Sequence, residues 1–366
     1  MKIRGAVLEA TGCSRPYSDS APISITALEL DDPGPDEVLI EIEAAGICHS
    51  DLSVVDGNRP RPLPMLLGHE AAGRVRGVGA RVNNVKVGDR VVTTFLPRCG
   101  QCAGCKTNGL RPCSAGSTAN TAGVLLSGER RLSRDGAFVN HHLGVSGFAT
   151  HAVVDSRSLV RLHSDIPPDV AALLGCAVLT GGGAVLNAAP PQKGDRLAVV
   201  GLGAVGMAAV LTALALDDVE VIAVDALESK RSAALAMGAA RAISPTECGD
   251  LKADVVIEAA GNVRALETAI AITAAGGSTV TVGLPAPDAR TSFSPASLVG
   301  EGRRIIGSYL GSAVPERDIP VFAQMWRAGR LPIEQLITSK IQLDDINEGM
   351  DRLADGAALR QIIEFS

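Results

Sequence analysis

A glycine-rich turn between an apolar strand and an apolar helix constrains this sequence more than any other feature. The segment 201–206 has the pattern G-x-G-x-x-G and follows the apolar run Leu197–Val200 directly. The first glycine permits a tight turn, the second lets backbone approach a pyrophosphate, and the third lets the helix pack closely on the sheet. The pattern therefore predicts a dinucleotide site, and a doubly wound domain that binds nothing is the alternative. Its residues are Gly201, Leu202, Gly203, Ala204, Val205 and Gly206.

The preferred dinucleotide is indicated by Asp225. This residue ends a second predicted strand, at the expected offset of about 20 residues from the glycines. A carboxylate there accepts hydrogen bonds from ribose hydroxyls and repels a 2′-phosphate. Ala226 and Leu227 follow, so no arginine is placed immediately beside it. The spacing favours NAD over NADP.

Strands and helices alternate around this turn. Such alternation is typical of a parallel, doubly wound sheet, the Rossmann arrangement. Before about Leu174 the pattern is instead short β-rich segments separated by Gly, Pro and Asp turns. The predicted strands are Leu197–Val200, Val219–Val224, Ala253–Ile257, Ser278–Val282 and Arg304–Tyr309, and the predicted helices include Glu228–Met237 and Val263–Ala274.

Length and composition agree with a globular chain of two domains. A chain of 366 residues makes about two domains, and 46% hydrophobic residues exclude disorder. A net charge of −6 without a basic stripe disfavours nucleic acid and anionic membranes. The uncharged run Leu197–Leu216 is long enough for a membrane span but is interpreted as strand, turn and helix. We expect no signal peptide and a cytoplasmic protein.

Four cysteines lie close together in Cys99-x-x-Cys102-x-x-Cys105 and Cys113. Four thiolates at this density fit a closed tetrahedral zinc site, with no open position for chemistry. An iron–sulfur cluster also uses four cysteines, and free thiols are the plainest alternative. The predicted dinucleotide site in the same chain favours zinc, which would hold together a lobe too small to bury a core.

A second set of candidate metal ligands is spread along the chain. Cys48 lies in Gly-Ile-Cys-His-Ser-Asp, His69 in Gly-His-Glu-Ala-Ala-Gly, and Cys176 follows Gly175. A catalytic zinc needs three protein ligands and one exchangeable position. A single Cys or His in an apolar stretch is more often part of the core. Spacing alone therefore does not decide between a catalytic zinc site and ordinary core positions.

These motifs occur in the order seen in the medium-chain zinc alcohol dehydrogenases, which the whole chain resembles. The resemblance implies an α/β protein with a GroES-like β-rich catalytic domain and a Rossmann domain. We place the catalytic domain at 1–177 and 318–366, and the NAD-binding domain at 178–317. The resemblance also implies about two zinc ions per chain, one catalytic and one structural, and NAD as hydride carrier.

The resemblance assigns a role to each matching residue. It implies catalytic zinc ligands at Cys48, His69 and Cys176, with Glu70 as a nearby carboxylate and Asp51 orienting His69. Ser50 matches the hydroxyl that takes the alcohol proton. The cofactor contacts that it implies, besides the glycine-rich turn and Asp225, are His49, Thr180, Lys230, Gly283, Leu284 and, at a phosphate, Arg360.

The sequence departs from the family at Ser53, where several members have a histidine that completes the proton path. Phe95 matches an aromatic wall of the substrate pocket. Arg59 suits a salt bridge, with a carboxylate-bearing substrate as the second reading. His141 and His142 are expected at the surface, with a loop that approaches the pocket as the alternative, and Cys13 and Cys248 at ordinary structural positions.

The resulting hypothesis is a zinc- and NAD-dependent dehydrogenase of primary aliphatic or aryl alcohols. The open alternatives are a thiol-adduct formaldehyde dehydrogenase and a non-catalytic zinc or redox-regulatory protein of the same fold. A polyol dehydrogenase is less favoured, since that branch tends to have Glu at the position of Cys176. The expected partners are a small alcohol or aldehyde and a second copy of the chain, as a homodimer or homotetramer.

Overall fold

The structure, a computed structural model, describes residues 1–365 and divides into two compact units. The first unit contains Met1–Cys176 and the C-terminal stretch from Ile337, and the second contains Ala177–Leu336. The sequence placed the second boundary at 317/318. The observed division differs there because α10 (Pro315–Arg327) packs on α5 (Leu179–Gly183) of the second unit, where the ring of Phe322 lies over Gly182.

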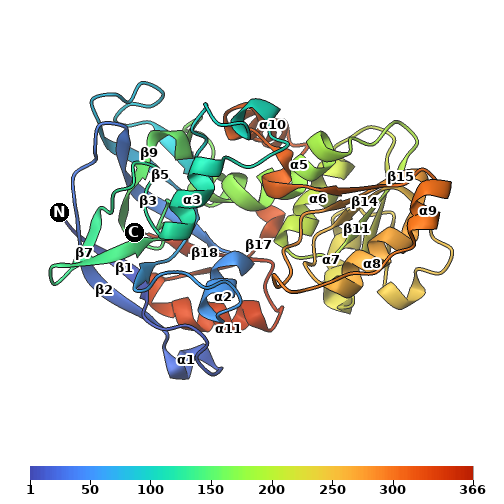
Figure 1. The fold of residues 1–366 in the computed structure, drawn as a ribbon, viewed down its shortest axis with the longest axis horizontal. Coiled ribbons are helices and arrows are strands. Elements are labelled where there is room, and N and C mark those ends of the chain that lie inside the picture. The colour runs from blue at the N-terminus through green and yellow to red at the C-terminus, as the bar shows by residue number, and fades with distance from the viewer. Residues whose placement is uncertain (366) are drawn as a thin grey trace. The chain divides into compact units, whose positions relative to one another are not determined.

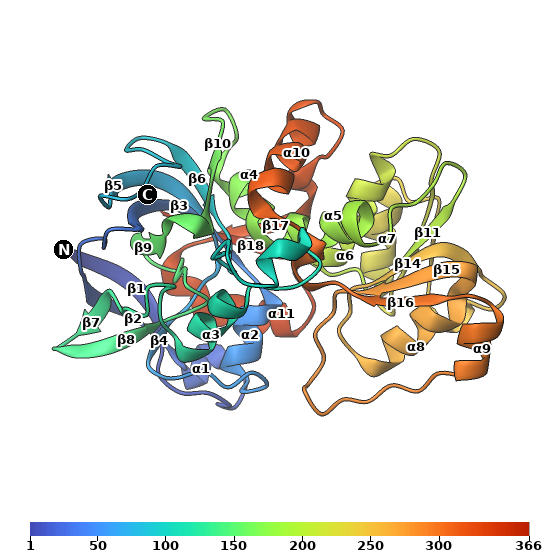
Figure 2. The ribbon, with the colours of Figure 1, turned by 45° about the horizontal axis from the view of Figure 1, so that its top comes forward.

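The first unit is built from a small closed barrel and a seven-stranded sheet. Figure 2 shows the barrel strands on the side of the N-terminus. In spatial order the barrel strands are β1 (Lys2–Leu8), β2 (Ile23–Leu30), β7 (Leu132–Arg134), β8 (Ala137–His141) and β4 (Met65–Leu66). The sheet strands are β10 (Leu159–Leu162), β6 (Arg90–Thr93), β5 (Glu70–Val78), β3 (Glu37–Ile47), β18 (Arg360–Glu364) and β17 (Ile337–Ile341), with β9 (His151–Asp155) also paired to β3.

The long strand β3 organises this unit. It pairs with β5, β9 and β18, so the C-terminal strand β18 is antiparallel to a strand near the start of the chain. Its residues Ile40, Ile42 and Ile47 are buried in the main core of the unit. Short helices cover the sheet and loops, with α2 and α11 in contact (Figure 1). They are α1 (Tyr17–Ser20), α2 (His49–Val55), α3 (Ser114–Ala122), α4 (Pro168–Leu173) and α11 (Ile346–Ala354).

The second unit is the predicted parallel, doubly wound sheet. All its strand pairs are parallel, in the order β13-β12-β11-β14-β15-β16. Helices α6 and α7 lie on one face and α8 on the other (Figure 2). The strands are β11 (Arg196–Val200), β12 (Glu220–Val224), β13 (Arg241–Ile243), β14 (Ala253–Glu258), β15 (Thr273–Thr281) and β16 (Arg304–Gly307). The further helices are α6 (Ala204–Leu214), α7 (Glu228–Ala236), α8 (Val263–Ile272) and α9 (Pro295–Gly300).

The uncharged run 197–216 forms β11, a turn and α6, as the sequence predicted. A different segment has the length and composition of a membrane span, namely the continuous helical stretch Pro168–Ala188, of mean hydropathy 1.8. It is 89% buried within the protein, as a core helix is. Two π-helical turns interrupt it, and the first, Leu174–Val178, carries Cys176.

Candidate active site and cofactor-binding residues

The first unit brings together four side chains of the predicted catalytic cluster. The ligand atoms of Cys48, His69, Glu70 and Cys176 all lie within 4.8 Å of one another, and all four residues are buried. Strand pairing explains part of this arrangement, because Gly46 at the end of β3 faces Glu70 at the start of β5. A Cβ on Gly46 would lie 2.6 Å from Oε2 of Glu70, so the glycine leaves room for that carboxylate.

The imidazole of His69 is oriented by Asp51. Oδ1 of Asp51 lies 3.0 Å from Nδ1 of His69, while Oδ2 accepts a hydrogen bond from the backbone N–H of Cys48 at 2.9 Å. Because a carboxylate only accepts, Nδ1–H donates to Asp51, and Nε2, which lies 3.6 Å from Sγ of Cys176, is the nitrogen placed to bind a metal. Burial alone would raise the pKa of Asp51, but the imidazoles of His69 and His142 lower it to about 2.

The electrostatic effects on the cluster act in opposite directions. The hydrogen bond from the Cys176 thiol holds the pKa of Cys48 well below its usual range, against the effect of burial. Burial raises the pKa of Glu70 to about 8, although the Arg360 guanidinium acts in the opposite direction. Neither carboxylate oxygen of Glu70 accepts a hydrogen bond among residues 1–365, and only Oε1 lies within ion-pair distance of Arg360, so Oε2 can face a metal. Two sulfurs and one imidazole nitrogen around one point are the donor set of a catalytic zinc.

Arg360, predicted to contact a cofactor phosphate, lies beside this cluster. Its guanidinium is 2% exposed, donates to the carbonyl of Ile47 at 2.6 Å and lies 3.2 Å from Oε1 of Glu70. It enters from β18, the C-terminal strand that pairs with the end of β3. The structure therefore shows Arg360 as the counter-charge of Glu70, and its phosphate contact stays a prediction.

The expectation that His141 and His142 are surface residues is wrong, because both are 1% exposed. Nδ1 of His142 lies 3.1 Å from the same Asp51 oxygen that holds His69, and the two imidazoles meet edge to face at 5.5 Å. His141 accepts a hydrogen bond from the backbone N–H of Arg131 at 3.1 Å, so its role is structural. The alternative expectation, a loop that approaches the pocket, agrees with His142, which directly follows the end of β8 at His141.

The predicted proton path lies on α2, and the predicted pocket wall, Phe95, contacts His69. His49 and Ser50 form the first turn of α2, with His49 exposed and Ser50 half-buried. Ser53 donates its hydroxyl proton to the carbonyl of His49 at 2.9 Å, one helical turn earlier. The ring of Phe95 packs edge to face on His69, with centroids 5.6 Å apart.

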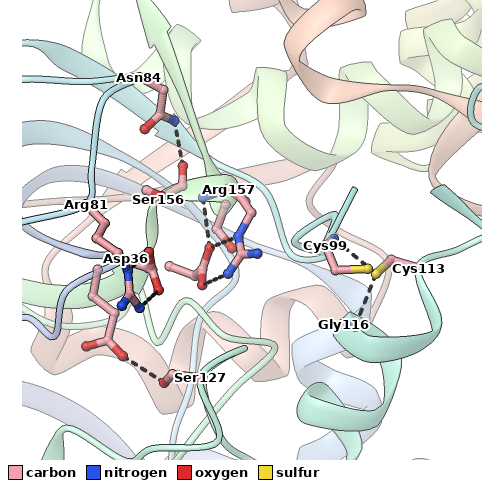
Figure 3. Close-up of polar contacts among 12 residues, drawn as sticks. Asp36, Arg81, Asn84, Cys99, Cys113, Gly116, Ser127, Ser156 and Arg157 are labelled. Carbon is pink, nitrogen blue, oxygen red and sulfur yellow. Dashed lines mark hydrogen bonds and ion pairs between the residues drawn. The ribbon is translucent and has the colours of Figure 1, made fainter. Parts of the chain in front are cut away.

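The four-cysteine lobe also forms a compact cluster. The Sγ atoms of Cys99 and Cys105 are 3.9 Å apart, as are those of Cys102 and Cys113. Tetrahedral zinc with Zn–S bonds near 2.3 Å places sulfurs about 3.8 Å apart. The sulfur of Cys113 accepts hydrogen bonds from the backbone N–H groups of Cys99 and Gly116 (Figure 3). One ion fits this spacing better than a four-iron cluster, whose thiolates bind different irons and lie farther apart.

In the second unit the glycine-rich turn has the geometry that the sequence predicted. Gly201 has φ +93°, and a Cβ on it would lie 2.5 Å from the backbone nitrogen of Ala260. A Cβ on Gly206 would lie 1.9 Å from the carbonyl oxygen of Gly201, so only glycine lets α6 approach the strand end. Asp225 accepts hydrogen bonds from the backbone N–H groups of Leu202 at 2.7 Å and Leu227 at 2.9 Å.

The remaining predicted cofactor residues of this unit lie on separate elements. Thr180 is 9% exposed on α5, Lys230 is half-buried on α7, and Gly283 and Leu284 follow β15. Sequence reasoning missed Arg231, whose Nη1 donates to the carbonyls of Asp225 and Ala226 at 2.9 and 2.8 Å. The spacing could have identified Arg231, because it lies six residues after Asp225, in the first turn of α7 and close to the end of β12.

Comparisons with known proteins agree with this description. Residues 34–164 match the alcohol dehydrogenase GroES-like domain, and residues 204–327 match the zinc-binding dehydrogenase family. The chain is 35% identical to the geraniol dehydrogenase of Castellaniella defragrans, over 94% of this chain and 95% of the relative. It is 33% identical to the NDMA-dependent alcohol dehydrogenase of Amycolatopsis methanolica over all of both chains.

A solved structure has the same fold over the whole chain. The benzyl alcohol dehydrogenase of Acinetobacter calcoaceticus is 30% identical, with a TM-score of 0.91 and full coverage of both chains. These relatives are alcohol dehydrogenases, which makes this protein an oxidoreductase of small alcohols or aldehydes. The chain belongs to the zinc-binding alcohol dehydrogenase family of the medium-chain dehydrogenases/reductases.

Proposed function

We propose that this protein catalyses the reversible, NAD-linked oxidation of primary aliphatic or aryl alcohols at a zinc site. The observation that carries the proposal is the buried cluster of Cys48, His69 and Cys176, in which Asp51 holds Nδ1 of His69 and Nε2 faces Cys176. Geraniol and benzyl alcohol, named for two relatives, are both primary alcohols and support the substrate class.

The chain's own residues define what each part would do. Cys48, His69 and Cys176 would hold the zinc, with Glu70 as an additional carboxylate beside it. When bound, zinc supplies Lewis-acid stabilisation of the negative charge that develops on the substrate oxygen. Ser50 would accept the alcohol proton at Oγ, and His49, exposed on the same turn, would pass it to water or cofactor. Phe95 covers one edge of His69 and helps to exclude water.

The cofactor preference rests on Asp225 and the glycine-rich turn. When bound, NAD supplies the acceptor for hydride. The turn 201–206 would bind its pyrophosphate at the start of α6, while Asp225 would accept hydrogen bonds from ribose hydroxyls. His49, Thr180, Lys230, Gly283, Leu284 and Arg360 are the further cofactor contacts that we propose. The four-cysteine lobe would hold the second, structural zinc.

The first experiment measures NADH formation with primary aliphatic, benzylic, allylic and thiol-adduct alcohols, alongside zinc per chain. Turnover with NAD that disappears in Cys176→Ser, with about one zinc lost, supports the proposal. Cys13→Ser is the matched control, because Cys13 lies in the same unit but in neither cluster. Turnover only with the thiol adduct would select the formaldehyde dehydrogenase alternative. Since one relative is NDMA-dependent, activity that requires NDMA would contradict simple exchange with free NAD.

We also propose self-association through β16, the edge strand of the six-stranded sheet. An open strand edge presents unpaired backbone groups, which a second copy can satisfy across a two-fold axis. Light scattering on the purified protein measures the assembly mass. A monomer at micromolar concentration would contradict this part of the proposal.

A further inference from the structure

Glu258 is a buried carboxylate to which the motifs of the sequence assign no role. It is the last residue of β14 and is 1% exposed. Strand β14 lies beside β11, at the point where the sheet order reverses between the two halves of the unit. In doubly wound sheets the ligand crevice lies outside the carboxyl ends of the strands at this reversal. Glu258 therefore lies at the carboxyl-terminal edge of the sheet, where a dinucleotide would bind.

The side chain of Glu258 connects two loops that are far apart in sequence. Oε1 accepts hydrogen bonds from the backbone N–H groups of Ala260 at 2.8 Å and Gly261 at 2.7 Å. Oε2 accepts a hydrogen bond from the hydroxyl of Thr281 at 2.7 Å, at the end of β15. Its main-chain carbonyl also accepts N–H groups from Val282 at 2.9 Å and Gly283 at 3.3 Å. One residue thus fixes both the loop 259–262 and the loop that begins at 282.

These contacts replace the cation that a buried carboxylate ordinarily requires. Within residues 1–365 the hydrogen-bond partners of the Glu258 side chain are two backbone amides and one hydroxyl, none of them charged. Burying an ionised group without a counter-charge is costly unless hydrogen bonds satisfy it. An apolar side chain would have avoided this cost. The role of Glu258 therefore lies in the hydrogen bonds that it makes to the two loops.

The two loops also touch each other and the glycine-rich turn through backbone. A Cβ on Gly283 would lie 2.3 Å from the nitrogen of Gly261, and a Cβ on Gly201 would lie 2.5 Å from the nitrogen of Ala260. Three loops at the carboxyl ends of β11, β14 and β15 are therefore in close backbone contact at their glycines. A shift of the loop that Glu258 holds would move its neighbours.

We infer that Glu258 is a positioning residue for the nicotinamide half of the dinucleotide, an inference that rests on the proposed use of NAD. The adenosine half of a dinucleotide binds on the β11–β13 side, where Asp225 follows β12. Loops 259–262 and 282–284 belong to the other half of the sheet, which begins with β14. The carboxylate holds these loops in the conformation that receives the nicotinamide ribose and ring.

The test compares NADH and AMP binding in Glu258→Ala, Glu258→Gln and Asp254→Ala. Asp254 is the matched control, because it lies on the same strand, accepts the backbone N–H of Arg196 at 2.9 Å, and sits at the amino end of β14. Glu258→Ala should raise the Kd of NADH about tenfold or more and leave that of AMP within about twofold. Glu258→Gln keeps an acceptor for the two amides and a donor to Thr281, and should restore most of the affinity.

Steady-state kinetics add a second readout. Glu258→Ala should raise the KM for NAD, and it should also lower kcat at saturating NAD because a misplaced ring reacts slowly. Asp254→Ala should lower Tm and leave both Kd values unchanged. If Glu258→Ala does not fold, Thr281→Val removes only the contact to β15 and should raise the Kd of NADH about threefold.

The outcomes separate this inference from the proposed function. Wild-type protein that fails to bind NADH overturns the proposed cofactor and the inference with it. Normal binding by the wild type, together with unchanged binding by Glu258→Ala, overturns the inference alone. Equal weakening of NADH and AMP by Glu258→Ala also overturns it, because the effect would then be general damage to the unit.

Discussion

Asp51 and His69 form a buried pair in which Oδ1 of the carboxylate lies 3.0 Å from Nδ1 of the imidazole. The pair fixes which nitrogen of His69 carries the proton, so that Nε2 can bind a cation. Asp51→Asn would present an amide N–H to Nδ1 and favour the tautomer in which Nε2 is protonated. We expect zinc affinity at this cluster to fall about 10- to 100-fold. Competition with a chromophoric chelator measures this change.

The control for this prediction is the second metal cluster. Because the Asp51 side chain contacts His69, His142 and the backbone of Cys48, the four-cysteine lobe should release its zinc at the wild-type rate. Two zinc ions held as tightly in Asp51→Asn as in the wild type would show that the tautomer of His69 does not govern binding.

The four-cysteine lobe should hold a structural ion. Cys102→Ser removes one of four sulfurs, so zinc per chain should fall by about one and Tm should decrease. Hydrogen bonds from the backbone N–H of Cys105 and from Ser114 lower the pKa of Cys102, which favours the thiolate that binds a metal. Atomic emission spectroscopy measures the metal. Iron, with visible absorbance that disappears in the variant, would instead identify an iron–sulfur cluster.

Cofactor choice should depend on Asp225 and Arg231 together. Removing the carboxylate in Asp225→Ala leaves the Arg231 guanidinium beside the backbone of residue 225, where a 2′-phosphate would lie. The ratio of kcat/KM for NADP to that for NAD should rise on the order of tenfold or more. Arg231→Ala in the same background should reverse the gain. An unchanged ratio in Asp225→Ala would mean that specificity is set elsewhere.

The sequence predicted the sheet of the second unit well because most of its strands are apolar runs that alternate with helices. The strand β13 was missed, since Arg241–Ile243 has three residues and only half-buried or exposed side chains. The helix Pro168–Ala188 was missed as well, because an apolar run without polar periodicity resembles a buried strand. In both cases tertiary packing, rather than a local pattern, determines the element.

In the candidate site, too, some residues could be predicted from local motifs and others depend on tertiary packing. Cys48, His69 and Cys176 could be named from motifs because metal ligands are restricted to a few residue types. His142, Arg231 and Glu258 could not be, since their roles depend on where a loop or helix returns to the strand ends. Tandem histidines are more often exposed, and only the turn after β8 places His142 against Asp51.

Acid sensitivity of stability should arise partly from His141. Burial lowers the pKa of His141 to about 4, whereas an unfolded histidine titrates near 6.5. Between these values the unfolded state binds the extra proton, so stability is lost as pH falls from 6.5 to 4 and levels off below that. The loss from this group amounts to at most about 3 kcal/mol. His141→Asn should therefore show a smaller drop in Tm between pH 7 and pH 5 than the wild type.

His163→Asn, at an exposed histidine of the same unit, is the control and should keep the wild-type drop. Equal drops in all three proteins would mean that His141 is charged in the folded state, in conflict with its buried position and its acceptor role toward Arg131.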